Sequence, residues 1–278
     1  QENLVITFNP RDGICHQLID ISSSLSLEAL ANGVPRRQIT QEQFISPSGL
    51  FRLPTSEIDE MILDAVDRWS DSLQAYGMDI STGRVVPFRA TQHLVDEPAD
   101  VSSVPLLWMQ HIKPQQVTWP INGSFHKPQY IACETSLLVR NTNYVLLRRF
   151  STKEEARRLV AAPYLADDYP FELIGLENHL NYIYCPNREI SEEEAIGLSA
   201  LLNSGLIDRY FRISNGNTQV NAAELRALPL PPMTVILTIG EILAKDEAAD
   251  LDEVVVHVLQ ELGLIPTDLP ILRETRVV

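Results

Sequence analysis

Residues 209 to 232, RYFRISNGNTQVNAAELRALPLPP, hold the side chains of this chain that are best suited to recognise a ligand. Amide side chains fall there on alternate positions, and alternate residues of an extended backbone share one face. Each amide carries both a hydrogen-bond donor and an acceptor. Such a row can match the edges of nucleobases, or it can brace an unusual turn. The row consists of Asn215, Asn217, Gln219 and Asn221.

The last amide of this row has a second explanation. Asn221 stands where the N-cap of a helix would, and Glu224 follows three residues later, which is the spacing of a capping box. The prolines that close the segment are mainly structural. Helix capping therefore accounts for Asn221, and the other three amides remain the candidates for contacts with bases.

Basic side chains gather in residues 81–160, although the whole chain has a net charge of −15. This segment holds 10 basic and 6 acidic side chains, a net charge of +4. A polyanion could bind there, while the acidic remainder opposes indiscriminate binding. Chance clustering on a solvated surface or helix is the alternative. The candidates for phosphate contacts are Arg148, Arg149, Lys153 and, beside the amide row, Arg212.

No motif of a self-sufficient enzyme is present. The sequence lacks GxGxxG, a P-loop, GxSxG, HExxH and paired CxxC motifs. His179 lies two residues from Glu177, but a lone histidine is more often structural than a metal ligand or a base. Three widely spaced cysteines predict neither a disulfide framework nor a zinc site, and they fit a reducing compartment such as the cytoplasm.

The hydrophobic pattern predicts the elements that must position these side chains. A helix over 56–76 has Ser56 as its cap, Asp59 at the third helical position and Gly77 as its stop. Residues 80–150 alternate short β-like runs with Pro, Gly and Asn, which predicts an antiparallel sheet-rich region. Other predicted elements are strands over 3–8 and 18–21, a strand pair over 171–184, and helices over 151–162, 191–202, 234–247 and 251–263.

The length of 278 residues predicts one large or two modest domains. No apolar run approaches the roughly 18 residues that span a bilayer, so we expect no membrane partner. The start lacks the features of a signal peptide, and Gln1 in place of Met indicates a fragment or a processed product.

Four stretches in this order resemble the C-terminal half of gamma-class N6-adenine DNA methyltransferases from bacterial type II restriction–modification systems. They are STGRVVPFR (81–89), NYVLLRRFSTKEEARRLVAAPY (143–164), GLENHLNYIY (175–184) and LLNSGLIDRYFRISNGNTQVNAAELRALPLPP (201–232). The opening QENLVITF also resembles the last strands of that family's catalytic domain.

The resemblance implies a mixed α+β fold. Residues 1–50 would be the tail of a Rossmann-like catalytic sheet with a linker, 51–233 a sheet-rich target-recognition domain with flanking helices, and 234–278 a helical extension. In the full enzyme, the catalytic domain binds S-adenosylmethionine and methylates a flipped adenine. Its cofactor motif and its Asn/Asp-Pro-Pro-aromatic motif are missing here, so no catalytic residue is carried over and no cofactor is expected in this segment.

The partners that the resemblance implies are double-stranded DNA and a catalytic methyltransferase domain, in cis or in trans. Two loops would then join the DNA-binding candidates, with a structural turn or a surface arginine as the alternative in each. One holds Thr82, Gly83, Arg84 and Arg89, and the other holds Asn178, His179 and Asn181. The amides of the row would contact adenine through N6 and N7.

Two other functions stay open. A non-catalytic specificity subunit of a multi-subunit restriction system also ends its recognition units with an LPLPP-like pattern, although it usually carries two units separated by long helices. An acidic protein-interaction module that binds a basic partner is the third hypothesis.

Overall fold

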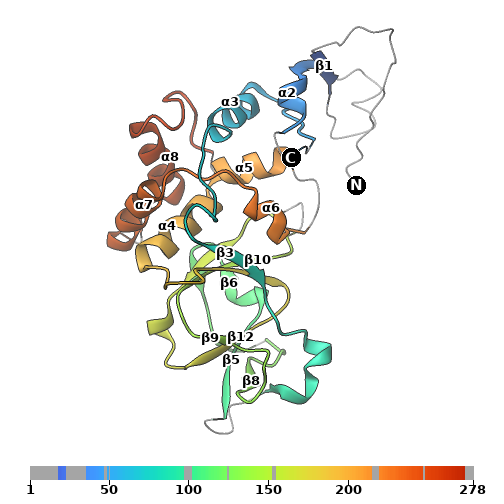
Figure 1. Ribbon diagram of the computed structural model, residues 1–278, viewed down its shortest axis with the longest axis vertical. Coiled ribbons are helices and arrows are strands. Elements are labelled where there is room, and N and C mark those ends of the chain that lie inside the picture. Colours follow the sequence, from blue (N-terminus) through green and yellow to red (C-terminus); the bar gives the residue numbers. More distant parts are fainter. Residues whose placement is uncertain are drawn as a thin grey trace.

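The computed structural model describes residues 18–22, 36–46, 49, 51–96, 102–123, 125–151, 155–214, 219–246 and 248–272. Most helices gather at one end of the molecule and the two larger sheets at the other (Figure 1), so the predicted mixture of helices and strands is confirmed. The helices are α2 (Gln41–Phe44), α3 (Glu57–Val66), α4 (Glu192–Asn203), α5 (Gly205–Ser214), α6 (Ala222–Arg226), α7 (Met233–Lys245) and α8 (Leu251–Glu261).

Two sheets make up the other end. The four-stranded sheet has the order β11-β10-β13-β3 and is antiparallel throughout, whereas the five-stranded sheet, β4-β8-β5-β12-β9, contains the parallel pair β5 and β12. The strands are β1 (Leu18–Ile21), β2 (Arg37–Thr40), β3 (Asp79–Thr82), β4 (Leu94–Val95), β5 (Ser103–Leu107), β6 (Ile112–Lys113), β7 (Gln116–Val117), β8 (Tyr130–Ala132), β9 (Val139–Arg140), β10 (Tyr144–Arg148), β11 (Ala161–Tyr164), β12 (Leu173–Leu176) and β13 (Leu180–Tyr184).

Several elements confirm the hydrophobic pattern. Strand 18–21 is β1, and the helices predicted over 191–202, 234–247 and 251–263 are α4, α7 and α8. Ser56 and Ser191 cap their helices through the predicted capping boxes, and Glu224 accepts from the backbone N–H of Asn221 at 3.0 Å before α6. The strand predicted over 3–8 lies outside the described residues.

The helix predicted over 56–76 is too long. Helix α3 ends at Val66, and the chain then turns so that Asp71 pairs in both directions with Leu230. Trp69 and Leu73 are still buried in the core, but they lie after the helix, Leu73 in a turn. The spacing of apolar residues therefore predicted too long a helix, because residues in the following turns can also bury apolar side chains.

The helix predicted over 151–162 is wrong for its described residues. Residues 155–160 are irregular, and β11 begins at Ala161. The buried carboxylate of Asp208 accepts from the backbone N–H of Arg158. The side-chain oxygen of Asn203 accepts from the backbone N–H of Ala161 at 2.9 Å, and its side-chain nitrogen donates to the carbonyl of Ala161 at 2.7 Å. These tertiary bonds replace the helical ones.

The strand pair predicted over 171–184 is wrong in its pairing. Both strands form, but β12 pairs with β5 and β9, while β13 pairs with β10 and β3. Residues 177–179 connect β12 in one sheet to β13 in the other. Contacts with the residue Val85, which follows β3, fix their position. Val85 forms a parallel bridge with Glu177, and its carbonyl accepts from the N–H of Asn178 at 2.9 Å.

The largest core cluster joins residues from α3, β3, β10, α4, α5, α7 and α8. It extends across position 233, where the sequence suggested a boundary, since α7 and α8 pack beside α4. The three-part division of the chain therefore stays a prediction. Among the described residues, no helix combines the length and the apolar character needed to cross a bilayer.

Candidate nucleic-acid interface

The end of the amide row lies against the residues that directly follow β10. The backbone N–H of Val220 donates to the carbonyl oxygen of Arg149 at 2.8 Å, and Phe150 forms an antiparallel bridge with Gln219. The amide oxygen of Gln219 accepts from Nε and Nη2 of Arg149, at 2.8 and 2.5 Å. The amide takes this orientation because the reverse would set its N–H groups against those of the guanidinium.

Arg149 also binds the loop over 177–179. Its backbone N–H donates to the carbonyl of His179 at 2.8 Å, and Nη1 donates to the carbonyl of Asn178 at 3.2 Å. Three stretches that are far apart in the sequence therefore meet around one guanidinium. We call Arg149, Asn178, His179 and Gln219 the recognition cluster.

The histidine of this cluster is held by a carboxylate. Glu177 is fully buried, and it accepts from the backbone N–H of His179 at 3.1 Å and from Nδ1 of the same residue. The imidazole packs edge-on against Phe150, with 5.0 Å between the ring centres, yet its side chain is 44% exposed. A proton on Nδ1 leaves Nε2 of the neutral ring as an acceptor, whereas the charged ring donates from both nitrogens.

Two predicted residues support the cluster from beneath. Thr82 donates its hydroxyl to the side-chain oxygen of Asn181 at 2.9 Å, and the Asn181 nitrogen donates to the carbonyl of Val220 at 3.0 Å. Asn181 is fully buried, so both atoms of its amide serve the fold. In this structure Asn181 holds Val220, which follows Gln219 in the sequence, onto the sheet.

Gly83 allows β3 and the loop to approach each other closely. Its N–H donates to the carbonyl of Leu180 at 2.8 Å, and a Cβ at this position would lie 2.2 Å from the carbonyl oxygen of Glu177. Any side chain would therefore push the loop away from the strand.

Arg84 and Arg89 lie on the surface beyond Gly83, and both are exposed. Within the part of the chain that the structure describes, neither forms an ion pair. The guanidinium of Arg89 lies over the ring of Phe88, 5.2 Å from its centre. Both side chains are thus exposed to solvent.

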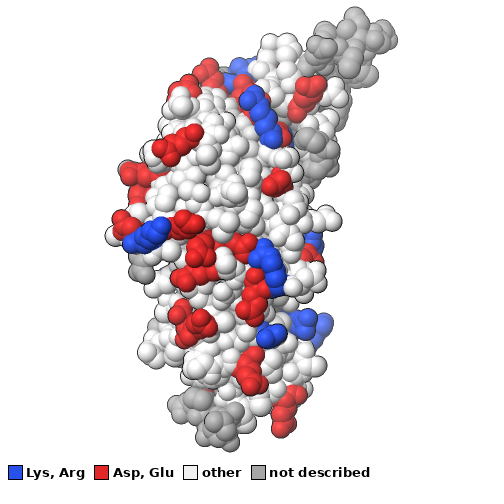
Figure 2. Space-filling model, turned by 60° about the vertical axis from the view of Figure 1, so that its left-hand side comes forward, with Lys and Arg blue, Asp and Glu red and all other residues white. Residues whose placement is uncertain are grey.

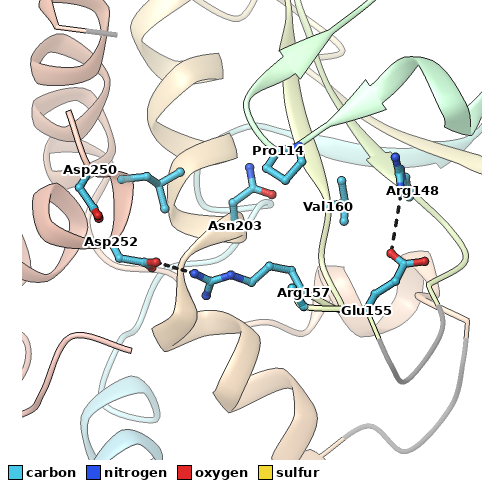
Figure 3. Close-up of a pocket in the computed structure, with 10 residues that line it drawn as sticks. Pro114, Arg148, Glu155, Arg157, Val160, Asn203, Asp250 and Asp252 are labelled. Carbon is cyan, nitrogen blue, oxygen red and sulfur yellow. Dashed lines mark hydrogen bonds and ion pairs between the residues drawn. The ribbon is translucent and has the colours of Figure 1, made fainter. Parts of the chain in front are cut away.

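Arg148 points to the other face of β10, because consecutive residues of a strand alternate. Its Nε donates to the carbonyl of Ile112 at 2.7 Å, and its Nη1 lies 3.8 Å from Glu155. It lines a cavity of about 540 Å³ beside the pair formed by Arg157 and Asp252 (Figure 3). Arg148 is therefore apart from the recognition cluster.

Arg212 braces a loop. Its Nε donates to Asp208 at 2.7 Å, and its Nη2 donates to the carbonyl of Glu155 at 3.0 Å. Only 14% of its side chain is exposed, and Asp208 is fully buried. Three other predicted site residues, Lys153, Asn215 and Asn217, lie outside the described residues.

Sequence reasoning missed several residues that shape this region. The sequence patterns do not single out Phe150 or Phe88, and they mark Glu177 only as a neighbour of His179. One signal for Phe88 is its place directly after Pro87, because proline disfavours a continuous helix or strand there.

The charge distribution sets one side of the molecule apart. Figure 2 brings the left-hand side of Figure 1, where α7 and α8 lie, toward the viewer. Acidic side chains dominate this face. A polyanion is repelled there. Among the described residues, no cluster of three or more His, Cys, Asp or Glu side chains could hold a metal ion.

Comparison with known proteins identifies relatives of the chain. It is 35% identical over 219 residues to the type II methyltransferase M.PstI of Providencia stuartii, an alignment that covers 77% of this chain and 43% of that protein. It is 31% identical over 227 residues to the type II methyltransferase M.BsuBI of Bacillus subtilis, covering 80% and 45%. The chain is therefore homologous to type II methyltransferases, and it spans a little under half their length. No family model matches the chain.

Proposed function

We propose that this chain is the DNA-recognition part of a type II, adenine-specific methyltransferase. It binds double-stranded DNA and positions the target site, so that a flipped adenine receives a methyl group in a catalytic domain supplied in cis or in trans. S-adenosylmethionine would be bound by that domain, because this sequence lacks the glycine-bearing cofactor motif. The homology to M.PstI and M.BsuBI supports the enzyme class.

The recognition cluster is the observation that carries the proposal. Arg149 bonds Gln219 on one side and the carbonyls of Asn178 and His179 on the other. A planar guanidinium that grips an amide fixes its orientation, and a fixed amide discriminates between base edges better than a mobile one. Gln219 is thus the residue proposed to contact a base, and Arg149 is the residue that positions it.

The other predicted residues divide by exposure. Arg84 and Arg89 are exposed and form no described ion pair, so we propose phosphate contacts for them. His179 and Asn178 lie at the edge of the cluster and are partly exposed. Thr82, Gly83, Asn181 and Arg212 maintain the arrangement through internal contacts. Arg148 shares its charge with Glu155, and it contributes less to DNA binding.

Binding measured across salt concentrations tests the proposal. Fluorescence anisotropy with a library of 40-bp duplexes should show weak binding by this chain alone. The phosphate contacts proposed for Arg84 and Arg89 predict a slope of log affinity against log salt of about −2. Adding the catalytic half of a homologous methyltransferase should produce methylation at one sequence, and a scrambled duplex is the control.

Salt-insensitive or absent binding, both alone and with the catalytic half, would contradict the proposal. The same experiment separates the specificity-subunit hypothesis, in which binding would be specific but the added catalytic half would leave the DNA unmethylated. The described residues do not favour that hypothesis, since their longest helix, α7, has 13 residues and does not separate two recognition units.

A further inference from the structure

Phe88 has the largest exposed fraction, 76%, of any large apolar side chain among the described residues. It occupies the centre of the short 3-10 turn η1 (Pro87–Arg89). Pro87 restricts the backbone at the start of this turn, and the N–H of Ala90 bonds the carbonyls of Val86 and Pro87 at 3.1 Å each. The ring is thus carried into solvent by an ordered turn.

The turn is anchored on both sides. Val85 and Ala90 are fully buried in the core of the five-stranded sheet region. The N–H of Val85 also donates to the carbonyl of Leu176 at 2.9 Å, next to the loop of the recognition cluster. Since backbone bonds join the two features, the position of Phe88 is coupled to that of the cluster.

The sequence that flanks the ring is positively charged. Arg89 lies over the ring, Arg84 is exposed nearby in the sequence, and residues 80–95 contain no Asp or Glu. The turn is the turquoise segment at the lower right of Figure 1, on the side of the sheets away from α7 and α8. This arrangement differs from the acidic face of Figure 2.

We propose that Phe88 is a wedge that stacks on a nucleobase and unstacks one base step of the bound duplex, while Arg84 and Arg89 contact the flanking phosphates. The inference rests on the proposed function and adds DNA deformation to it. Apolar side chains inserted between base steps are an established way to bend a duplex, and base stacking tolerates any sequence. A single ring among arginines suits a nucleobase better than a protein partner, which would need a larger apolar patch.

The test uses the full chain and the 40-bp duplex that it enriches from a randomised library. Adenines of that duplex are replaced one at a time by 2-aminopurine, whose fluorescence rises when the base loses its stacking. The wild-type chain should raise the signal at one step at least about threefold. Phe88→Ala should abolish the rise and weaken binding about 5- to 100-fold, the range expected for one lost base stack.

Phe88→Trp should restore both the signal and the affinity, whereas Phe88→Leu, which keeps apolar bulk without an aromatic face, should restore them only in part. Phe51→Ala is the matched control, because it removes another exposed phenylalanine, on the side of α2. Wild-type affinity and signal in Phe88→Ala would overturn the wedge and leave the recognition function intact. If the wild-type chain enriches no duplex, the proposed function and the wedge fall together.

Discussion

The backbone N–H of Val220 donates to the carbonyl oxygen of Arg149 at 2.8 Å. This bond extends the sheet that contains β10 to Val220, so the end of the amide row is aligned by a strand far from it in the sequence. The side-chain contact between Arg149 and Gln219 runs beside it. Arg149, at the end of a basic strand, and Gln219, at the end of the amide row, belong to separate motifs in the sequence but are joined in the structure.

Gln219→Ala should relax sequence specificity by about 1 to 3 kcal/mol at one base pair and leave the salt slope unchanged, because a base contact is lost and no phosphate contact is. Arg149→Lys should produce a similar loss while keeping the charge, since an ammonium cannot grip the amide as a guanidinium does. Sequencing of the duplexes bound from a randomised library measures both. Unchanged preferences in Gln219→Ala would exclude Gln219 from base contact.

Arg84→Ala should weaken binding to all duplexes alike and reduce the salt slope by about 1, because one phosphate contact is removed. Arg68→Ala is the control, since Arg68 is also exposed but lies just after α3, in the helical part of the molecule. Anisotropy titrations across salt concentrations give both slopes. Equal slopes for the Arg84 variant and the wild type would remove Arg84 from the interface.

Arg212→Ala should lower the free energy of unfolding by roughly 3 kcal/mol, because the fully buried Asp208 loses its charged partner. Urea unfolding followed by circular dichroism measures the change. In the control Arg226→Ala, the pair with Asp79 is about half exposed, so the loss should stay below about 1 kcal/mol. If the Arg212 variant is folded under the assay conditions and still binds DNA more weakly than the wild type, Arg212 contacts DNA directly.

Stability should fall as the pH drops from about 6.5 to 4, because burial lowers the pKa of His111 to about 4. The unfolded chain, with an ordinary histidine pKa near 6.5, binds a proton in this window that the folded chain does not bind. The stabilisation is present above pH 6.5, and its loss at pH 4 is roughly 3 kcal/mol. Its Nδ1 accepts from Trp108 N–H at 2.8 Å, which favours the neutral ring.

Unfolding midpoints of the wild type and His111→Gln, measured between pH 7 and 4, test this expectation. The variant should be less stable at pH 7 and should have a shallower pH dependence. His257→Gln is the control, since His257 and its partner Glu261 are exposed and its replacement should leave the slope unchanged. An equal slope in wild type and His111→Gln would show that other groups cause the acid sensitivity.

Local patterns in the sequence were sufficient where local chemistry decides the structure. The capping boxes at Ser56 and Ser191 predicted where α3 and α4 begin, because a cap and its third helical residue satisfy each other over one turn. The helix predicted over 251–263 forms as α8, and Gly263 follows its end with a positive φ of 66°. Glycine tolerates that conformation, so its place in the sequence carries the information.

Only the tertiary structure decided how the predicted site residues divide. Asn181 and Gln219 are both amides near a predicted loop, yet Asn181 is buried within strand β13 and Gln219 lies against Arg149. Arg148 and Arg149 are neighbours in the sequence but point to opposite faces of the sheet. Long-range contacts set these differences, and they depend on which strands pair, which the local sequence does not specify.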